Sequence, residues 1–473
     1  MPVIHDRPGV FELGDVILIS YKSFDGSGTP KRLSIRELVQ EFSIYESIDG
    51  KFLTGDMTLL DATNAIQKLP ITGFERVEFF FRTPGTKKGF NFSVKSGHPM
   101  FVYSLTNRQG VKPRAQMYTL KFISLEAIRN HQTRVSKAFT GGIDQIVSDI
   151  CKNFLKTKKD ILVEDTKGTF KFVMPRIKPT SVIDYVRKEA ESKNYSNSGF
   201  LFYENAMGFH FKSYEGHFCR ADGSPRKVKA FYSPKVKNIG GTGIYDLQSV
   251  EDHRIIQQFN TLNNVANGVY ASKLITHDLF NKTFNEQEYD YNVEYGKQNH
   301  LEQTAKGDKR DNNGILPFFN YSSGETFGSL TEGMTFLQST TTKIHNTHEQ
   351  PDQKNVLQKR VSQHIAANSL ILEITIPGTT EINVGDIVHF SMPKYAEHIR
   401  EDQKDQDKYL TGRYLISAAR HHVSTLNKRH TLVLELIKDS FNVSYPEETL
   451  DLYTNNENDK GEIYLASEVD KYV

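Results

Sequence analysis

The sequence has no tryptophan, only two cysteines, little net charge and no long hydrophobic run. Cys151 and Cys219 fall in neither a CxxC pair nor a Cys/His ligand spacing, which argues against a disulfide framework or a zinc module. The net charge is only +2, which argues against nucleic-acid binding, because nucleic-acid-binding domains usually show a clustered basic field. No apolar run approaches the roughly 18–20 residues of a membrane span, and the N-terminus shows no secretory signal pattern. We therefore expect assembly in a reducing cytoplasm and no membrane span.

Motifs of catalysis are also missing. The sequence contains no GxSxG elbow, no Walker A loop, no HExxH and no GxGxxG after a predicted strand. The nearest approach to a metal site is Arg420-His421-His422 together with His430. No cysteine or carboxylate completes that set, and adjacent strand residues point to opposite faces, so a packing role is favoured. We expect no catalytic residue, no metal, no cofactor and no enzymatic activity.

One stretch, Pro225–Lys237, is strongly basic and interleaves its charges with Phe231 and Tyr232. Nucleic-acid contact by charge and stacking is one interpretation. A solvated linker between domains is the interpretation we favour. The glycine pairs at 141–142 and 240–241 similarly favour domain joints over phosphate-binding turns.

Two regions of the chain alternate with the period of a β-strand. Val77, Phe79 and Phe81 share one face of a predicted strand, and similar short segments recur between residues 10 and 130, with one short helix near 61–69. The same alternation returns over 370–437. The abundance of Phe and Tyr, 31 and 22 residues, agrees with a fold dominated by strands.

Between these regions the period becomes helical. Residues 142–155 and a second segment after Pro179 carry apolar stripes at helical spacing, and Ser181 with Asp184 predicts an N-cap for the second helix. A hairpin is predicted over 200–214. This part indicates a small α+β domain.

Three segments are polar and poorly periodic. Residues 296–355 indicate an insertion, partly loop, with an ordered patch at 315–319. The charged stretch 397–408 indicates a solvated loop, and the final 28 residues indicate an extended arm or a disordered tail.

The C-terminal strands follow an order that points to a known family. A strand leads to a Pro-Gly turn, a Gly-Asp strand start, a Gly-x-Tyr-x-Ile strand, a histidine-containing turn and a last strand with an acidic end. This order resembles the baseplate hub proteins of contractile-tailed, T-even-like bacteriophages and the hub part of the valine-glycine-repeat spike proteins of type VI secretion. The matching residues, to which we assign a structural role, are Pro377, Gly378, Gly385, Asp386, Val388, Gly412, Tyr414, Ile416, His421 and Asp439.

Some of these positions have a local physical reason. Gly378 and Gly385 fall where turns favour a positive φ. Asp386 is placed to accept hydrogen bonds from nearby backbone N–H groups. Tyr414 and Ile416 face the same side of their strand.

The resemblance implies a mainly β fold with an α+β insert: two tube-protein-like β-barrel domains plus a small α+β domain and a polar insertion. The expected division is a first barrel over 1–134, the α+β domain over 135–235, the second barrel in two parts, 236–295 and 356–445, the insertion over 296–355, and a C-terminal arm over 446–473.

The resemblance also implies a function in assembly. A trimer whose subunits each carry two similar barrels presents six near-equivalent modules, which adapts a hexameric tail tube to a trimeric central spike. Expected partners are further copies of the chain, the central spike protein, tail tube or tube-initiator proteins, the tape-measure protein and baseplate wedge proteins, with DNA only in transit through the lumen. The expected location is the virion tail baseplate, after assembly in the host cytoplasm.

Other functions remain open at this point. Another structural tail protein, such as a tube initiator or distal tail protein, is the main alternative. A tail-associated cell-wall hydrolase and a type VI spike subunit are less favoured, because neither a carboxylate pair nor a long needle of short repeats is visible.

Overall fold

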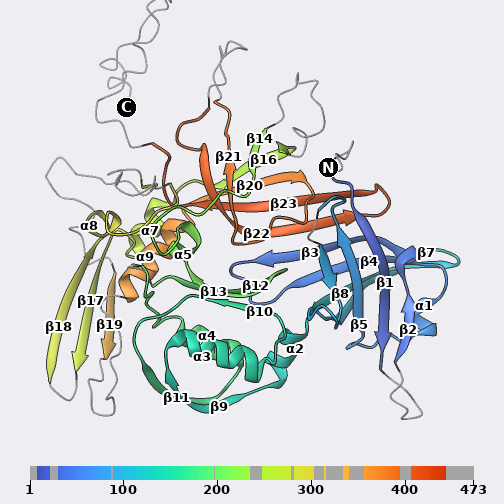
Figure 1. The fold of residues 1–473 in the computed structure, drawn as a ribbon, viewed down its shortest axis with the longest axis horizontal. Coiled ribbons are helices and arrows are strands. Elements are labelled where there is room, and N and C mark those ends of the chain that lie inside the picture. Colours follow the sequence, from blue (N-terminus) through green and yellow to red (C-terminus); the bar gives the residue numbers. More distant parts are fainter. Residues whose placement is uncertain are drawn as a thin grey trace, which may run out of the picture.

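The computed structural model describes residues 8–21, 30–86, 89–195, 198–234, 248–278, 282–302, 314–315, 334–339, 356–394 and 406–443 (Figure 1). The predicted fold class, mainly β with an α+β insert, is confirmed. The ribbon shows two strand-rich blocks side by side, with the helical part and a small three-stranded sheet to one side of them.

The first block is built from the N-terminal strands. Its strands are β1 (Glu12–Ser20), β2 (Lys31–Ser34), β3 (Val39–Ser47), β4 (Thr54–Asp61), β5 (Arg76–Arg82), β6 (Phe90–Phe92), β7 (Met100–Lys112) and β8 (Ala115–Ser124), with the short helices η1 (Arg36–Leu38) and α1 (Ala65–Lys68). The pairing order is β2-β1-β5-β7-β8-β4-β3, and β6 adds to β5. Alternation explains the core: Val77, Phe79 and Phe81 of β5 are buried, whereas their neighbours in sequence are half-exposed.

The second block closes on itself. It contains β14 (Phe231–Pro234), β15 (Ser249–Val250), β16 (Asp252–Gln257), β20 (Leu370–Pro377), β21 (Ile387–Phe390), β22 (Gly412–Ser424) and β23 (Arg429–Lys438). Only Glu251 separates β15, which pairs with β14, from β16, which pairs with β20. The pairings β20-β23, β23-β22, β22-β21 and β21-β14 complete the circuit. The block is therefore a closed barrel around its own core.

A single long strand joins the two blocks. One edge of β22 pairs with β23 from Leu415 to Ser424, while its other edge pairs with β21 from Gly412 to Leu415 and with β3 from Ala418 to Ser424. Val423, near the end of β22, packs into the core of the first block. The two blocks therefore form one continuous hydrogen-bonded sheet.

Both blocks use the same pairing plan. In each block seven strands can be numbered in chain order: β1, β2, β3, β4, β5, β7 and β8 in the first, and β14, β15, β16, β20, β21, β22 and β23 in the second. In both blocks the first strand pairs with the second and the fifth, and the third strand pairs with the fourth. The fourth strand pairs with the seventh, and the sixth strand pairs with the fifth and the seventh. One direction differs. β14 runs parallel to both its neighbours, whereas β1 runs antiparallel to both.

The α+β part lies between the blocks in sequence. It contains α2 (Leu125–Gln132), β9 (Val135–Gly141), α3 (Ile143–Asp149), η2 (Ile150–Phe154), β10 (Asp160–Val163), β11 (Phe170–Ile177), α4 (Pro179–Val186), β12 (Phe200–Asn205), β13 (Gly208–Ser213) and α5 (Tyr214–Phe218). β9 pairs with β11, and β10, β13 and β12 form a second sheet. A separate apolar core fills this part.

The predicted N-cap of the second helix is wrong. α4 begins at Pro179 after the N-cap Lys178, because proline supplies the helical φ at the first position and has no N–H to satisfy. Ser181 lies inside the helix. Asp184 pairs instead with Lys51 of the first block and with Arg187.

The segment between β16 and β20 differs from the predicted division. It contains α7 (Thr261–Ala266), β17 (Ala271–Asp278), β18 (Thr283–Asp290), α8 (Tyr291–Tyr295), β19 (Thr335–Ser339) and α9 (Leu357–Ala367). β17 and β18, which we expected in the second barrel, form a separate sheet with β19, which comes from the predicted insertion. Alternation in sequence predicts a strand but does not say which sheet it joins.

Other predictions meet the structure only in part. We predicted a solvated linker over Pro225–Lys237, but its residues Phe231–Pro234 form the strand β14. Tyr232 of this strand is buried in the core of the second block. Gly240-Gly241, residues 316–319, most of the loop 397–408 and the C-terminal arm lie outside the described residues.

Candidate functional site

The places where the blocks meet are held by buried charged side chains. Glu46 of β3 is 3 % exposed. Its Oε1 accepts a hydrogen bond from the backbone N–H of Ala206 at 2.8 Å, and its Oε2 accepts one from Val384 at 3.2 Å. One carboxylate thus ties the first block to the β12–β13 turn and to the loop that precedes β21. Burial raises the pKa of Glu46 to about 7, against the lowering effect of these two bonds.

Glu46→Gln is expected to reduce the dependence of stability on pH. The folded-state pKa of about 7 lies above the ordinary value of 4.5, so the folded protein binds more protons between these values, and the free energy of unfolding falls as pH rises through this window. The total fall from this residue is about 3 kcal/mol. Urea unfolding at pH 5 and pH 8 measures it, with the exposed Glu37→Gln as control. An unchanged pH dependence in Glu46→Gln contradicts the assignment.

A second junction is a buried triad. Lys159 donates from Nζ to Glu126 of α2 at 2.8 Å and to Glu204 of β12, and all three side chains are at most 2 % exposed. Burial by itself would lower the pKa of Lys159, but the two carboxylates outweigh it and raise that pKa. Glu204 Oε2 also accepts from the backbone N–H of Leu53 at 3.1 Å and from Ser124 Oγ at 2.8 Å. The triad therefore fastens the α+β part to the first block.

A third junction attaches the segment between β16 and β20. Lys438 Nζ donates to Glu302 Oε1 at 2.8 Å and to the carbonyl of Thr411 at 3.1 Å. Burial lowers the pKa of Lys438, and the neighbouring Glu302 opposes this. Gly412 has a φ of +143°, and a Cβ there would collide with Glu302, so both the conformation and the space favour glycine.

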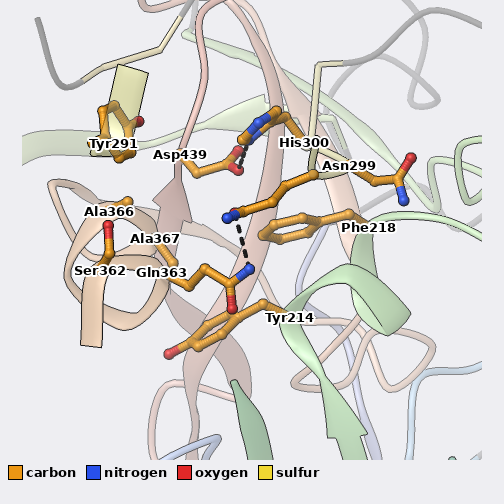
Figure 2. A pocket seen from close by; sticks show the side chains of 11 residues that line it. Tyr214, Phe218, Tyr291, Asn299, His300, Ser362, Gln363, Ala366, Ala367 and Asp439 are labelled. Carbon is orange, nitrogen blue, oxygen red and sulfur yellow. Dashed lines mark hydrogen bonds and ion pairs between the residues drawn. The ribbon is translucent and has the colours of Figure 1, made fainter. Parts of the chain in front are cut away.

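Next to Lys438 in sequence, Asp439 contacts His300 (Figure 2). Asp439 Oδ2 bonds His300 Nδ1 at 2.9 Å, and Asp439 Oδ1 accepts from the backbone N–H of Leu301 at 3.1 Å. Burial by itself would lower the pKa of His300, but the hydrogen bond and charge of Asp439 raise it above its usual value. The cavity lined by these two residues has a volume of about 20 Å³, which is room for one water molecule and not for a substrate.

The structure distributes the ten family-motif residues around the second block. Pro377 and Val388 lie on strands β20 and β21, Gly378, Gly385 and Asp386 lie in the loop between these strands, Gly412, Tyr414, Ile416 and His421 lie on β22, and Asp439 follows β23. They do not converge on one point. Gly385 and Asp386 exchange backbone hydrogen bonds with Ile416, and Asp386 Oδ2 accepts from the N–H of Asn383 at 3.2 Å.

The two glycines of this loop act differently. Gly385 has the positive φ that we expected, +89°. Gly378 does not belong to the positive-φ residues. A Cβ on Gly378 would instead collide with the His430 ring, so the reason for glycine there is close approach.

The histidine pair packs against the first block. His421 Nδ1 and His430 Nε2 are 3.2 Å apart, and both residues are fully buried. The His421 ring lies 4.7 Å from Phe90 and the His430 ring 5.7 Å from Phe81, between ring centroids. Burial lowers the pKa of both, that of His430 to about 3. Among the described residues, no group of three His, Cys, Asp or Glu side chains is placed to hold a metal ion.

An exposed apolar segment runs from the end of β16 into α7 and was not anticipated. Ile256, Phe259 and Leu262 are 48 %, 69 % and 85 % exposed, and Ile255 and Val265 add to the same segment. We call residues 255–265 the apolar segment. Within the described chain β16 pairs only with β20. The spacing of Ile255, Phe259 and Leu262 was visible in the sequence, but such a stripe usually predicts a buried face.

Comparison with known proteins gives similarity at the level of the fold. No protein-family model and no curated protein matches the chain. Among solved structures, a tail protein from Neisseria meningitidis MC58 aligns over 92 % of this chain and 100 % of its own, with a TM-score of 0.49 and 10 % identity. The 43 kDa tail protein of prophage MuSo2 from Shewanella oneidensis aligns over 90 % and 98 %, with a TM-score of 0.47 and 11 % identity.

A component of the type VI secretion system of E. coli, itself structurally similar to bacteriophage T4 tail proteins, aligns over 87 % of this chain and 76 % of its own, with a TM-score of 0.39 and 8 % identity. In the part of the chain that the structure describes, no helix is both long and apolar enough to cross a bilayer.

Proposed function

We propose that this chain is a structural subunit of a contractile tail, the baseplate hub that joins the tail tube to the central spike. One observation carries the proposal: two strand blocks with the same pairing plan are fused through the shared strand β22. Three such chains carry six related blocks, and a three-fold assembly of them offers near six-fold symmetry to a hexameric tube.

The fusion explains why the two blocks can act as neighbours in a ring. Residues Ala418 to Ser424 of β22 pair with β3, so the relative position of the blocks is held by backbone hydrogen bonds and by Glu46. A rigid offset between two modules is what a symmetry adaptor needs, because the same offset must recur between subunits.

The apolar segment supplies a contact between subunits. Monomeric proteins rarely expose neighbouring large apolar side chains. The segment begins within β16, whose second edge is unpaired in the described chain. Association through this edge and the segment would bury both. On this proposal the partners are two further copies, the central spike, tube, tape-measure and wedge proteins, the ten motif residues are structural, and the location is the virion baseplate.

Leu262→Asp is expected to convert a trimer into a monomer. We expect the unmodified chain to form a trimer that buries more than about 2,000 Å² in total, as obligate interfaces do. A charge placed in the interface should cost about 2–4 kcal/mol per contact, which weakens association by roughly 30- to 1,000-fold. Size-exclusion chromatography with light scattering over a concentration series measures the mass.

The matched control is Leu426→Asp, in the β22–β23 turn, where leucine is 71 % exposed. This variant should remain trimeric. A strictly monomeric unmodified chain at every concentration, even with the spike protein present, argues against the hub. A six-fold ring in electron micrographs favours the tube-initiator alternative.

A further inference from the structure

A second, larger cavity lies where the α+β part meets the second block. It has a volume of about 320 Å³, within the range of small-ligand sites. It is lined by the β12–β13 hairpin, the segment 226–229 and residues 383–387, which lead into the start of β21. No step of the proposed assembly uses it.

The lining of this cavity is rich in cations. Lys212 of β13 and four side chains of the following segment contribute positive charge, namely Arg220, Arg226, Lys227 and Lys229, against one lining carboxylate, Asp386. Within the described chain none of the five forms an ion pair, and Arg226 Nε donates instead to the carbonyl of Gly216 at 2.6 Å. Burial and the charge of Arg226 lower the pKa of Lys212, against the raising effect of Glu164 and Asp386.

Three buried polar side chains also line the cavity. Tyr203, His210 and His217 are 0 %, 7 % and 3 % exposed. Tyr203 Oη, His210 Nδ1 and His217 Nε2 have no hydrogen-bond partner among the described residues. Such groups are rare in folded proteins, because each one forgoes the hydrogen bonds that it makes with water.

The partners of the other ring nitrogens orient these groups. His210 Nε2 lies 2.9 Å from Asn205 Oδ1, and because Asn205 Nδ2 donates to the carbonyl of Val384, that oxygen acts as the acceptor. His217 Nδ1 lies 3.3 Å from the carbonyl of Gly385 and therefore donates to it. Burial keeps both rings neutral, with the pKa of His210 lowered to about 4, so the free nitrogen of each ring presents a lone pair that can accept a hydrogen bond from a ligand O–H group.

We propose that this cavity binds a phosphate group, either free or as the monoester of a small organic molecule. The cavity is lined by five cationic side chains and one carboxylate, Asp386. This excess of positive charge suits a doubly charged oxyanion ligand better than a ligand with a single carboxylate group. Tyr203 Oη can donate to a phosphate oxygen, and His210 Nδ1 and His217 Nε2 can accept from a protonated phosphate oxygen. The cavity exceeds the size of one phosphate, which leaves space for an organic remainder.

Calorimetric titration of the full-length chain at low salt tests the site. Inorganic phosphate should bind with a dissociation constant below about 1 mM. Lys212→Gln and the exposed Arg220→Gln should each weaken binding by roughly tenfold, since each removes a charge-assisted contact. Lys171→Gln, on the exposed face of β11, is the matched control and should bind like the unmodified protein.

Glycerol phosphate identifies the source of the phosphate group. Glycerol phosphate binding more tightly than inorganic phosphate indicates a monoester, and equal affinity indicates the free ion. Absence of heat up to about 10 mM phosphate, acetate binding as tightly as phosphate, or equal weakening in Lys171→Gln overturns the proposal. If Lys212→Gln does not fold, Arg220→Gln decides alone. None of these outcomes bears on the trimer, which chromatography tests separately.

Discussion

Lys159→Ala is expected to lower the free energy of unfolding by about 3–5 kcal/mol. The substitution leaves Glu126 and Glu204 buried next to each other without a compensating charge. Glu204 also accepts from Leu53 and Ser124, so the loss should loosen the attachment of the α+β part to the first block. Urea unfolding measures the energy, and hydrogen exchange of the Leu53 amide measures the loosening.

The neighbouring Lys158→Ala is the matched control, because Lys158 is exposed. It should change stability by less than about 0.5 kcal/mol. The combined variant Lys159→Met, Glu126→Gln and Glu204→Gln should recover much of the loss, since buried ion pairs replaced together often cost little. A single Lys159→Ala that is as stable as Lys158→Ala would refute the role of the triad.

Asp439→Ala is expected to release the segment between β16 and β20, at a cost of about 3–5 kcal/mol. It removes the counter-charge of His300 and the acceptor for the N–H of Leu301. Because the pKa of His300 is raised above 6.5, its contribution to stability is fully present below pH 6.5 and is lost as pH rises through the folded-state pKa. The deficit of the variant should therefore be larger at pH 5.5 than at pH 8.5.

Asp439→Asn separates charge from shape in the same position. The asparagine carbonyl oxygen can still accept the hydrogen bond from the backbone N–H of Leu301. The loss in free energy of unfolding should therefore be smaller, about 1.5–3 kcal/mol, and should follow the same pH trend. The exposed Asp252→Asn is the control. Hydrogen exchange at residues 298–302 reports release of the segment; protection there that matches the unmodified protein would contradict this account.

Much of the secondary structure could be predicted because local physics decides it. The strand over 76–82 alternates in sequence and in burial, and the hairpin at 200–214 and the helix after Pro179 appear as expected. The junctions could not be predicted in this way. Glu46, Lys159 and Glu302 stand alone in the sequence without partners at a recognisable spacing, since their partners are far away along the chain.

By itself, the sequence determined the mainly β class, the order of strands and helices, and the absence of a recognisable catalytic motif, because periodicity and turn residues act over a few neighbours. Tertiary structure alone decided that β22 serves both blocks, that β17 to β19 form their own sheet, and that the apolar segment faces outwards. Those choices depend on pairings such as His421 with Ile44, between residues near opposite ends of the chain, which no local pattern encodes.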